Sequence, residues 1–334
     1  MTRLGSRIRP LTTAALALVL ALSAGACDKG NTNNPGGNGG GGEAGGKVVA
    51  GGEAYSYSAD GFTVTATMRV KMELNTSEGQ GSAEINAVSL IEAKPAAGKL
   101  EVHGKVLNLE NYTGSGNLDP EFIKKQSEEQ GGKAMDIVAN ITNSETWKIM
   151  DLKGEEDEEA SKALAQNQRA EGEEGPMDMG LFGLPDLPSI DLEVGKKVAL
   201  PTRDSEESMP FGGTIPMQID ETWVLRGVEG DIAEFDVTIE SSGATEMSGG
   251  QGSAMISMLE ESAFTIKFDM KARVPVSLTG YSQSETNVDA GGQSFSMAIN
   301  NEIEATYVVG AAAPAADAPA ADAPAADAPA ADAG

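Results

Sequence analysis

Alternation of apolar and polar residues with a period of two is the feature that most constrains the fold of this chain. Between residues 62 and 74 every even position is apolar, and the odd positions between them hold threonines and charged residues. Successive side chains of a β-strand point to opposite faces, so this pattern predicts a strand with one face in a core and the other in water. Seven consecutive matches make the prediction strong.

A turn signal precedes this strand. Asp60-Gly61 is a favoured pair for a hairpin turn, and Tyr55 and Tyr57 lie just before it. We therefore expect residues 53 to 74 to form two adjacent antiparallel strands.

The rest of the first half predicts four more strands and two helices. The strands are expected at 82–93, 98–110, 134–142 and 145–152, and the helices at 120–130 and 155–170. Asp119 and Pro120 suit the start of the first helix, and the second begins with acids and ends with bases, which complements the helix dipole. In the second of the four strands the apolar residues move from even to odd positions, which suggests a bulge near Gly104.

The second half continues the strand pattern after a long surface connection expected at 171–188. Apolar residues alternate within 215–225, 233–239, 264–270, 274–278 and 295–309, with a turn at Glu229-Gly230. Long strands with one apolar face predict a mainly β fold: a large, curved antiparallel sheet that folds over its own core as an open barrel or a sandwich, with one or two short helices.

The first 26 residues are typical of an export signal. They hold three arginines, an apolar run of about 12 residues, and the small residues Ala24-Gly25-Ala26 directly before Cys27, the only cysteine. A membrane-spanning helix needs about 20 apolar residues, so we expect the segment to be cleaved rather than retained as an anchor.

This segment resembles a bacterial lipoprotein signal. The resemblance implies that the sulfur of Cys27 is acylated and that Cys27 becomes the new N-terminus of a membrane-anchored protein of the cell envelope. The residues Ala24-Gly25-Ala26 also fit ordinary secretory cleavage, which would release a soluble protein. Asp28 leaves the choice between inner and outer membrane open, because bacterial lineages read that position differently.

Low-complexity segments flank the predicted β region. Residues 27–47 form a Gly/Asn-rich tether after the cysteine, and residues 310–334 contain an Ala-Pro-Ala-Ala-Asp repeat that should stay extended and disordered. The β region at 48–309 is long enough for one large domain or for two halves, 48–170 and 189–309.

The chain is strongly acidic. Its formal net charge of −27 becomes −30 when residues 1–26 are removed, because they hold three arginines and no acid. We expect no nucleic acid and no anionic lipid headgroup as partners, since like charges repel before contact.

Motifs for catalysis and metal binding are missing from the sequence. His103 is the only histidine and is expected on the polar face of its strand, so neither a zinc motif nor a Ser-His-Asp triad is supported. The acidic run Glu155–Glu159 lacks the spacing of a calcium loop and indicates a solvated charge cluster. Trp147 and Trp223 lie on apolar strand positions, where core packing is expected unless the sheet encloses a cavity. We expect no catalytic residue, cofactor or metal.

Three further segments, Thr146–Gly154, Leu184–Pro188 followed by Val194-Gly195, and Glu221–Val237, resemble an uncharacterised family of exported, β-rich bacterial lipoproteins. The resemblance implies location and architecture, and it carries no activity.

Two hypotheses follow. The first is a non-enzymatic envelope lipoprotein that binds a protein or an apolar ligand or has a structural role. Inward-facing methionines would suit an irregular apolar ligand, although core filling is the default role for them; they are Met68, Met72, Met217, Met270 and Met297. The alternative is a carboxylate-based hydrolase that acts on envelope polysaccharide.

Overall fold

The computed structural model describes residues 54–77, 79–129, 135–168, 184–208, 214–249, 252–290 and 293–310. The predicted signal, Cys27, the tether and the C-terminal repeat lie outside these ranges. Within them the protein is mainly β, as predicted, with three short helices.

The described strands belong to one antiparallel sheet of 11 strands. The strands are β1 (Phe62–Thr76), β2 (Gly79–Ala96), β3 (Lys99–Gly116), β4 (Glu145–Met150), β5 (Lys197–Ala199), β6 (Arg203–Ser208), β7 (Thr214–Glu229), β8 (Ile232–Gly249), β9 (Gly252–Asp269), β10 (Val274–Ala290) and β11 (Gln293–Val309). The helices are α2 (Pro120–Glu129), α3 (Ile137–Thr142) and α4 (Glu158–Gln168).

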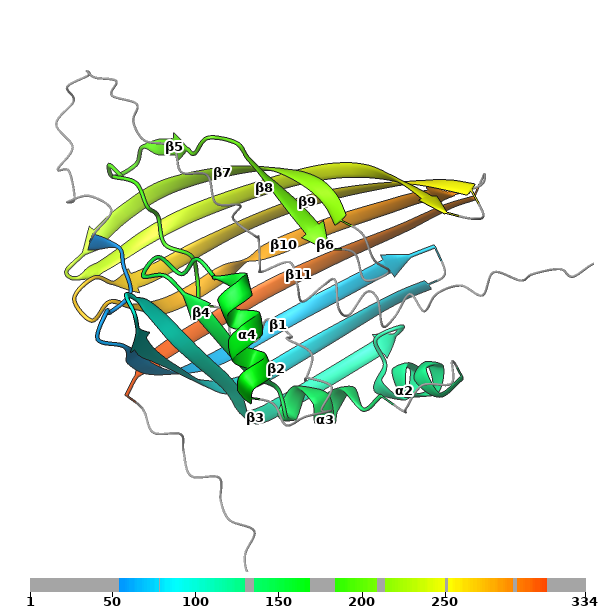
Figure 1. Cartoon of the computed structure of the whole chain (residues 1–334). Helices are drawn as coiled ribbons and strands as arrows, with labels where there is room; N and C mark the ends of the chain where they lie inside the picture. Colours follow the sequence, from blue (N-terminus) through cyan, green and yellow to red (C-terminus); the bar gives the residue numbers. More distant parts are fainter. Residues whose placement is uncertain are drawn as a thin grey trace, which may run out of the picture.

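The strand order is β4-β3-β2-β1-β11-β10-β9-β8-β7-β5, and β6 also pairs with β7. Figure 1 shows these strands side by side in a strongly curved sheet. Strands β4 and β5 end the order without pairing to each other, so the sheet is open. Because β1 pairs with β11, strands from both halves of the chain belong to the same sheet.

The predicted alternation in β1 matches its burial. Its even positions from Val64 to Leu74 are buried, whereas Arg69, Lys71 and Glu73 are exposed. We call the face that carries these buried residues the inner face of the sheet. Burying an aliphatic or methionine side chain of this size contributes about 1.5–3 kcal/mol, so the inner face supplies most of the stabilisation.

The predicted hairpin at residues 53 to 74 is wrong. The neighbours of β1 are β2 and β11, and the segment before it is not a strand. Tyr55 and Tyr57 are instead fully buried, with Tyr55 edge-on to Phe235 and Tyr57 edge-on to Phe268. Two large rings bury more apolar surface inside the curved sheet than they could on an added strand.

The predicted strand at 134–142 is also wrong, since residues 137–142 form helix α3. Asp136 caps this helix by accepting a hydrogen bond from the backbone N–H of Ala139 at 3.0 Å. Ile137 and Ile141, which are four residues apart and so share one helix face, are both buried. Asp119 caps α2 as predicted, because its Oδ1 accepts from the N–H groups of Glu121 and Phe122.

The face change predicted within β3 occurs further along the strand than Gly104. The pairing of β3 with β2 skips Leu107 and, nearer the end of the strand, Glu110. Each skipped residue is a bulge that moves the following side chains to the opposite face. Val106 therefore faces the core from an even position and Leu109 from an odd one.

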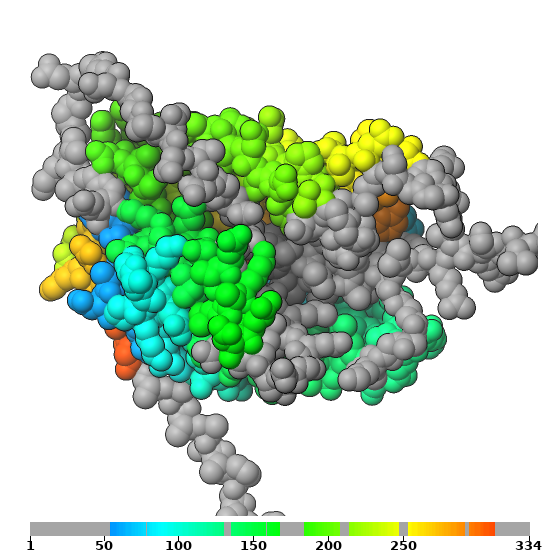
Figure 2. Space-filling view, viewed as in Figure 1, coloured from blue at the N-terminus to red at the C-terminus, as the bar shows by residue number. Residues whose placement is uncertain are grey.

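Helix α4 covers the free edge of β4 (Figure 1). The N–H of Asp157 donates to the carbonyl of Ile149 at 2.7 Å, and the N–H of Ile149 donates to Ser161 Oγ at 2.8 Å. Asp157 caps the helix at the N–H of Ala160, so α4 begins later than the predicted 155. Figure 2 shows α4 at the surface of the molecule in this view. These contacts use backbone groups that would otherwise leave an open sheet edge.

The described part of the expected surface connection at 171–188 is not a surface segment. Pro185, Leu187 and Pro188 are buried, and Leu187 N–H donates to the carbonyl of Lys153 at 2.7 Å. The hydroxyl of Tyr57 donates to the carbonyl of Pro185 at 2.6 Å. Residues 171–183 lie outside the described ranges.

None of the helices in the described ranges is both long and apolar enough to cross a membrane.

Candidate functional site

The inner face of the sheet is interrupted by polar side chains on β6 to β11. We call this set the polar belt; it consists of Arg203, Glu221, Ser241, Glu260, Ser262, Ser282, Ser284 and Asn301. Strand register places the set in two neighbouring rows, because directly paired residues point to the same face. One row pairs Arg203 with Ile219, Ile219 with Ser241, Ser241 with Glu260, and Glu260 with Ser284. The other row pairs Glu221 with Ile239, Ile239 with Ser262, Ser262 with Ser282, and Ser282 with Asn301.

Apolar clusters lie on both sides of the polar belt. On one side a small cluster contains Ile215, Met217, Ile256 and Met258, with Val288 packed against it. On the other side is the main core, which includes Trp223 and Phe235. The inner face therefore offers a band of hydrogen-bonding groups between two apolar surfaces, an arrangement suited to a ligand with both apolar and polar parts.

Glu221 is the centre of a buried charged group in the polar belt. Its Oε2 lies 3.2 Å from Nη1 of Arg203, and its Oε1 accepts a hydrogen bond from the indole Nε1–H of Trp223. The side chain of Glu221 is 7% exposed and that of Arg203 is 20% exposed. Both carboxylate oxygens thus have a partner, which a buried charge requires.

Glu260 is the second carboxyl group of the polar belt. Ser241 Oγ donates to Glu260 Oε2 at 3.1 Å. Burial raises the pKa of Glu260 above its ordinary value, because the charged form loses hydration, and the hydrogen bond from Ser241 opposes that effect only in part. A carboxyl group with a raised pKa can switch between accepting and donating a hydrogen bond nearer to neutral pH.

A buried amide and hydroxyl complete the far end of the polar belt. Asn301 is 5% exposed and Ser282 is 6% exposed. The Nδ2 of Asn301 donates to Ser282 Oγ at 3.2 Å. This pair links β10 to β11 through side chains on the inner face, which adds to the backbone pairing of the two strands.

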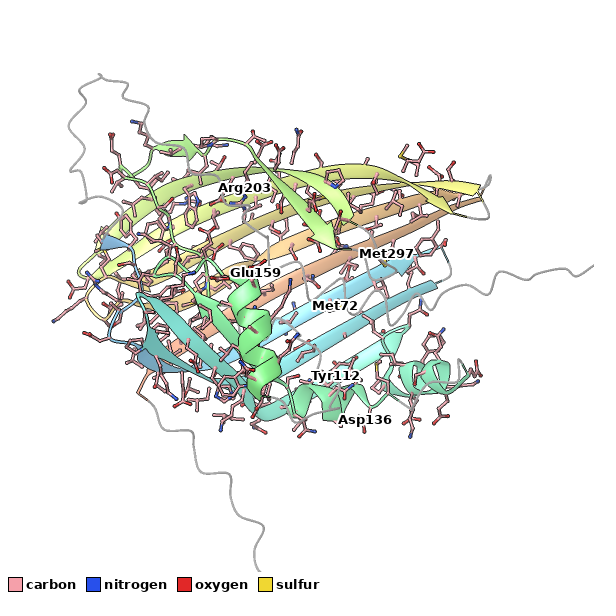
Figure 3. All side chains as sticks on the ribbon, viewed as in Figure 1. Met72, Tyr112, Asp136, Glu159, Arg203 and Met297 are labelled. Atoms are coloured by element: carbon pink, nitrogen blue, oxygen red, sulfur yellow. The ribbon has the colours of Figure 1, made fainter. Side chains whose placement is uncertain are left out.

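The predicted inward-facing methionines do lie on the inner face. Met68, Met72, Met217 and Met297 are buried, and Met270 is partly buried against the main core. Figure 3 labels Met72 and Met297 on neighbouring strands and Arg203 near β6 and β7. The burial of the methionines fits core packing, and their flexible side chains can adapt to irregular neighbours.

Trp223 is buried in the core as predicted, but Trp147 is not. Trp147 pairs with His103 across β4 and β3, and both side chains are on the outer face. The two rings stack with centroids 3.8 Å apart and an interplanar angle of 11°. His103 lies on the polar face of its strand as predicted, but its side chain is only 16% exposed because the indole of Trp147 covers it.

Two carboxylates lie near His103 on the outer face. Glu92 Oε2 is 3.9 Å from Nδ1, and Glu145 Oε2 is 3.7 Å from Nε2. These distances exceed those of direct hydrogen bonds. Within the described ranges no group of three or more His, Cys, Asp or Glu residues is arranged to hold a metal ion.

Two of the acids at 155–159 form ion pairs with lysines in the described structure. Lys148 Nζ lies 3.1 Å from Glu156 Oε2, and Lys99 Nζ lies 2.6 Å from Asp157 Oδ2. The hydrogen bond from Lys99 lowers the pKa of Asp157, with help from the N–H of Ala160. The acidic cluster is therefore not only solvated; it also forms ion pairs with lysines of neighbouring strands.

The polar belt was not predicted, although its signal is present in the sequence. Glu221 lies between Ile219 and Trp223 on the inward parity of β7, and Asn301 lies between Ile299 and Ile303 on that of β11. A polar residue at an inward position of a strong strand is the sign of a buried polar group. Only the register shows that such residues from different strands lie in the same two rows.

A scan of protein-family models finds no match to this chain, and a search of curated proteins finds no match either. The resemblance to exported β-rich lipoproteins therefore remains a prediction.

Proposed function

We propose that this protein is a non-enzymatic lipoprotein of the cell envelope, anchored through acylated Cys27, that holds an apolar ligand against the inner face of its sheet. The ligand-binding part of the proposal rests on one observation: two apolar clusters flank the polar belt on the inner face of the sheet. The export signal and the single cysteine carry the anchoring part.

The open sheet supports access to the inner face. Its two ends, β4 and β5, are not joined by backbone pairing. A closed barrel would need its strand ladder to break before a ligand could enter, whereas here, among the described residues, helix α4, the segment Pro185–Pro188 and side-chain packing lie beside the end of β4 in place of a further strand. The buried methionines can adjust their rotamers around an irregular ligand.

The hydrolase alternative is less well supported by the same residues. A carboxylate-based hydrolase needs one carboxyl group as the acid and a second carboxylate free to act as base or nucleophile. Glu260 has the raised pKa of an acid, but the oxygens of Glu221 are both occupied, by Arg203 and by Trp223. We expect no release of reducing ends when the protein is incubated with envelope polysaccharide.

The anchoring part is tested by the intact mass of the protein taken from the membrane fraction. We expect a chain that starts at residue 27 and carries fatty acyl groups. A Cys27→Ser variant should carry no acyl mass. Recovery of mature wild-type protein with an unmodified Cys27 from the soluble fraction would refute anchoring and leave ligand binding open.

The ligand-binding part is tested by native mass spectrometry of the gently extracted protein. We expect a co-purifying lipid whose occupancy falls in Met217→Gln, because Met217 belongs to the small apolar cluster beside the polar belt. Met255→Gln is the matched control, since Met255 is 48% exposed on the outer face of β9. Absence of any bound lipid, or equal loss in both variants, would contradict the proposal.

A further inference from the structure

Arg203 has more hydrogen-bond donors than the protein around it uses. A guanidinium group carries five N–H donors and no acceptor. Nη1 faces Glu221, whereas Nε is buried and has no hydrogen-bond partner. A buried donor without a partner destabilises the folded protein, and more so when the group is charged, so the unpaired Nε requires an explanation.

The contacts of Glu221 determine which edge of the guanidinium remains without a hydrogen-bond partner. One carboxylate oxygen of Glu221 accepts a hydrogen bond from Trp223, and the other forms an ion pair with Nη1 of Arg203. Glu221 therefore fixes the orientation of the guanidinium from one side. The opposite edge carries Nε–H and an N–H of Nη2, which point in parallel. This edge is the one that binds carboxylates and phosphates through two parallel hydrogen bonds.

The chemistry of this edge selects an oxyanion. A hydroxyl group or an amide has a single oxygen, which can accept one strong hydrogen bond or two weaker ones from this edge. A carboxylate or phosphate has two oxygens that can each accept one of the parallel N–H groups, and it also carries a negative charge. The side chain of Arg203 as a whole is 20% exposed, whereas its Nε atom is buried, so an oxyanion on this edge would bind in a site shielded from water.

The surroundings of Arg203 select an apolar tail. Arg203 pairs with Ile219, and Ser205, the next inward residue of β6, pairs with Met217 of the small apolar cluster. A ligand whose head contacts Arg203 therefore has the small apolar cluster two residues further along the strand, where burial of a hydrocarbon chain is favourable.

We propose that Arg203 is the head-group receptor of the inner face and that the ligand is an acyl or alkyl chain ending in an oxyanion, either a carboxylate or a phosphate. This inference rests on the proposed function and specifies its ligand. Glu221 is the positioning residue, because it orients the guanidinium without touching the ligand.

The acidity of the protein does not prevent binding at this position. The net charge of −27 opposes anionic surfaces and polymers, as the sequence predicts. At physiological ionic strength, exposed charges more than about 8 Å away are largely screened. The attraction between Arg203 and an anion in direct contact with it therefore depends mainly on Arg203 and its nearest neighbours. The inference is therefore a local exception to the expectation that anionic lipid headgroups are not partners.

The test compares three ligands that share a twelve-carbon chain: dodecanoate, dodecyl phosphate and neutral dodecanol. The protein is the chain from Asp28 to Gly334, which keeps the whole described sheet. Trp147→Phe leaves Trp223, hydrogen-bonded to Glu221, as the only tryptophan and hence as the reporter of binding. Dissociation constants come from its fluorescence below the micelle concentration.

We expect at least one of the two anions to bind about tenfold or more tightly than dodecanol, since hydrogen bonds to charged groups are worth roughly 1.5–3 kcal/mol. Arg203→Gln should remove this preference and leave dodecanol affinity within about twofold. Arg203→Lys should recover only part of it, because an ammonium group lacks the two parallel donors. Arg226→Gln is the matched control, since Arg226 is exposed and pairs with Asp236.

The outcomes separate the inference from the proposed function. Equal binding of all three ligands to the wild type, which needs no variant, would overturn the role of Arg203 and leave apolar binding intact. Equal weakening of all three ligands by Arg203→Gln would do the same. If none of the three ligands binds, the proposed function fails and the inference with it. Preference for one anion over the other identifies the carboxylate or the phosphate as the head group.

Discussion

Replacing Glu221 by glutamine tests whether the polar belt depends on its buried ion pair. The carboxylate of Glu221 accepts from Trp223 through one oxygen and faces Arg203 Nη1 at 3.2 Å through the other. An amide keeps one acceptor and turns two N–H donors toward a group that can only donate. Arg203 would then be a buried cation without a counter-ion.

The magnitude follows from the burial of the two side chains. Removing one partner of a buried pair costs about 3–5 kcal/mol, and the 20% exposure of Arg203 reduces this to about 2–4 kcal/mol. For a domain of this size each kcal/mol moves the thermal midpoint by roughly 2–4 °C, so Glu221→Gln should lower it by roughly 4–16 °C. Urea unfolding should show a lower midpoint with an unchanged m-value.

The double variant Glu221→Gln with Arg203→Met decides whether the charge is responsible. Removing both charges should restore at least half of the lost stability, since an apolar side chain is better tolerated there than an unpaired cation. A loss below about 1 kcal/mol in Glu221→Gln, or a double variant no more stable than the single one, would refute the assignment of Glu221 and Arg203 as a coupled buried pair.

Three further substitutions test other parts of the structure. Gly280→Ala should destabilise by about 1–3 kcal/mol, because the added carbon would lie 2.1 Å from a backbone oxygen of β9, whereas Gly227→Ala has nothing within 4 Å; a thermal melt in which the two variants match would contradict this packing. His103→Ala should cost about 0.5–1.5 kcal/mol and shift tryptophan emission to the red, because Trp147 loses its stacked partner; an unchanged spectrum would argue against the stack. Burial raises the pKa of Glu260, so the folded state binds the proton of this carboxyl group more tightly than the unfolded state does. As pH rises from 4.5 through the raised pKa, the wild type should therefore lose stability relative to Glu260→Gln. Urea midpoints that change in parallel across this range would exclude that linkage.

Local patterns predict the strands and caps well because their causes are local. The alternation in β1 and β11 predicts strands with one buried face, and Asp119 before α2 predicts an N-cap. Met72 and Trp223 were correctly predicted to point inward for the same reason.

Long-range pairing and the polar belt could not be predicted in this way. Nothing local to β1 shows that β11 is its neighbour, and the position of Trp147 on the outer face depends on its pairing with His103 of β3. Arg203 was missed because β6 reads Arg-Asp-Ser-Glu-Glu-Ser and shows no apolar alternation, so its inward side is set only by its register with β7. The acylation of Cys27 and the family resemblance stay predictions.

The place of β11 between β1 and β10 has a consequence for how the protein is made. Thr65 pairs with Val308, so the ladder between β1 and β11 joins residues from opposite ends of the domain. Loss of β11 would not trim a border of the sheet; it would leave two separate sheets, one from β4 to β1 and the other from β10 to β5. Each would expose an unpaired strand edge, which invites aggregation. Synthesis of β11, the last of the described strands, is therefore the event that joins the two parts into a single sheet.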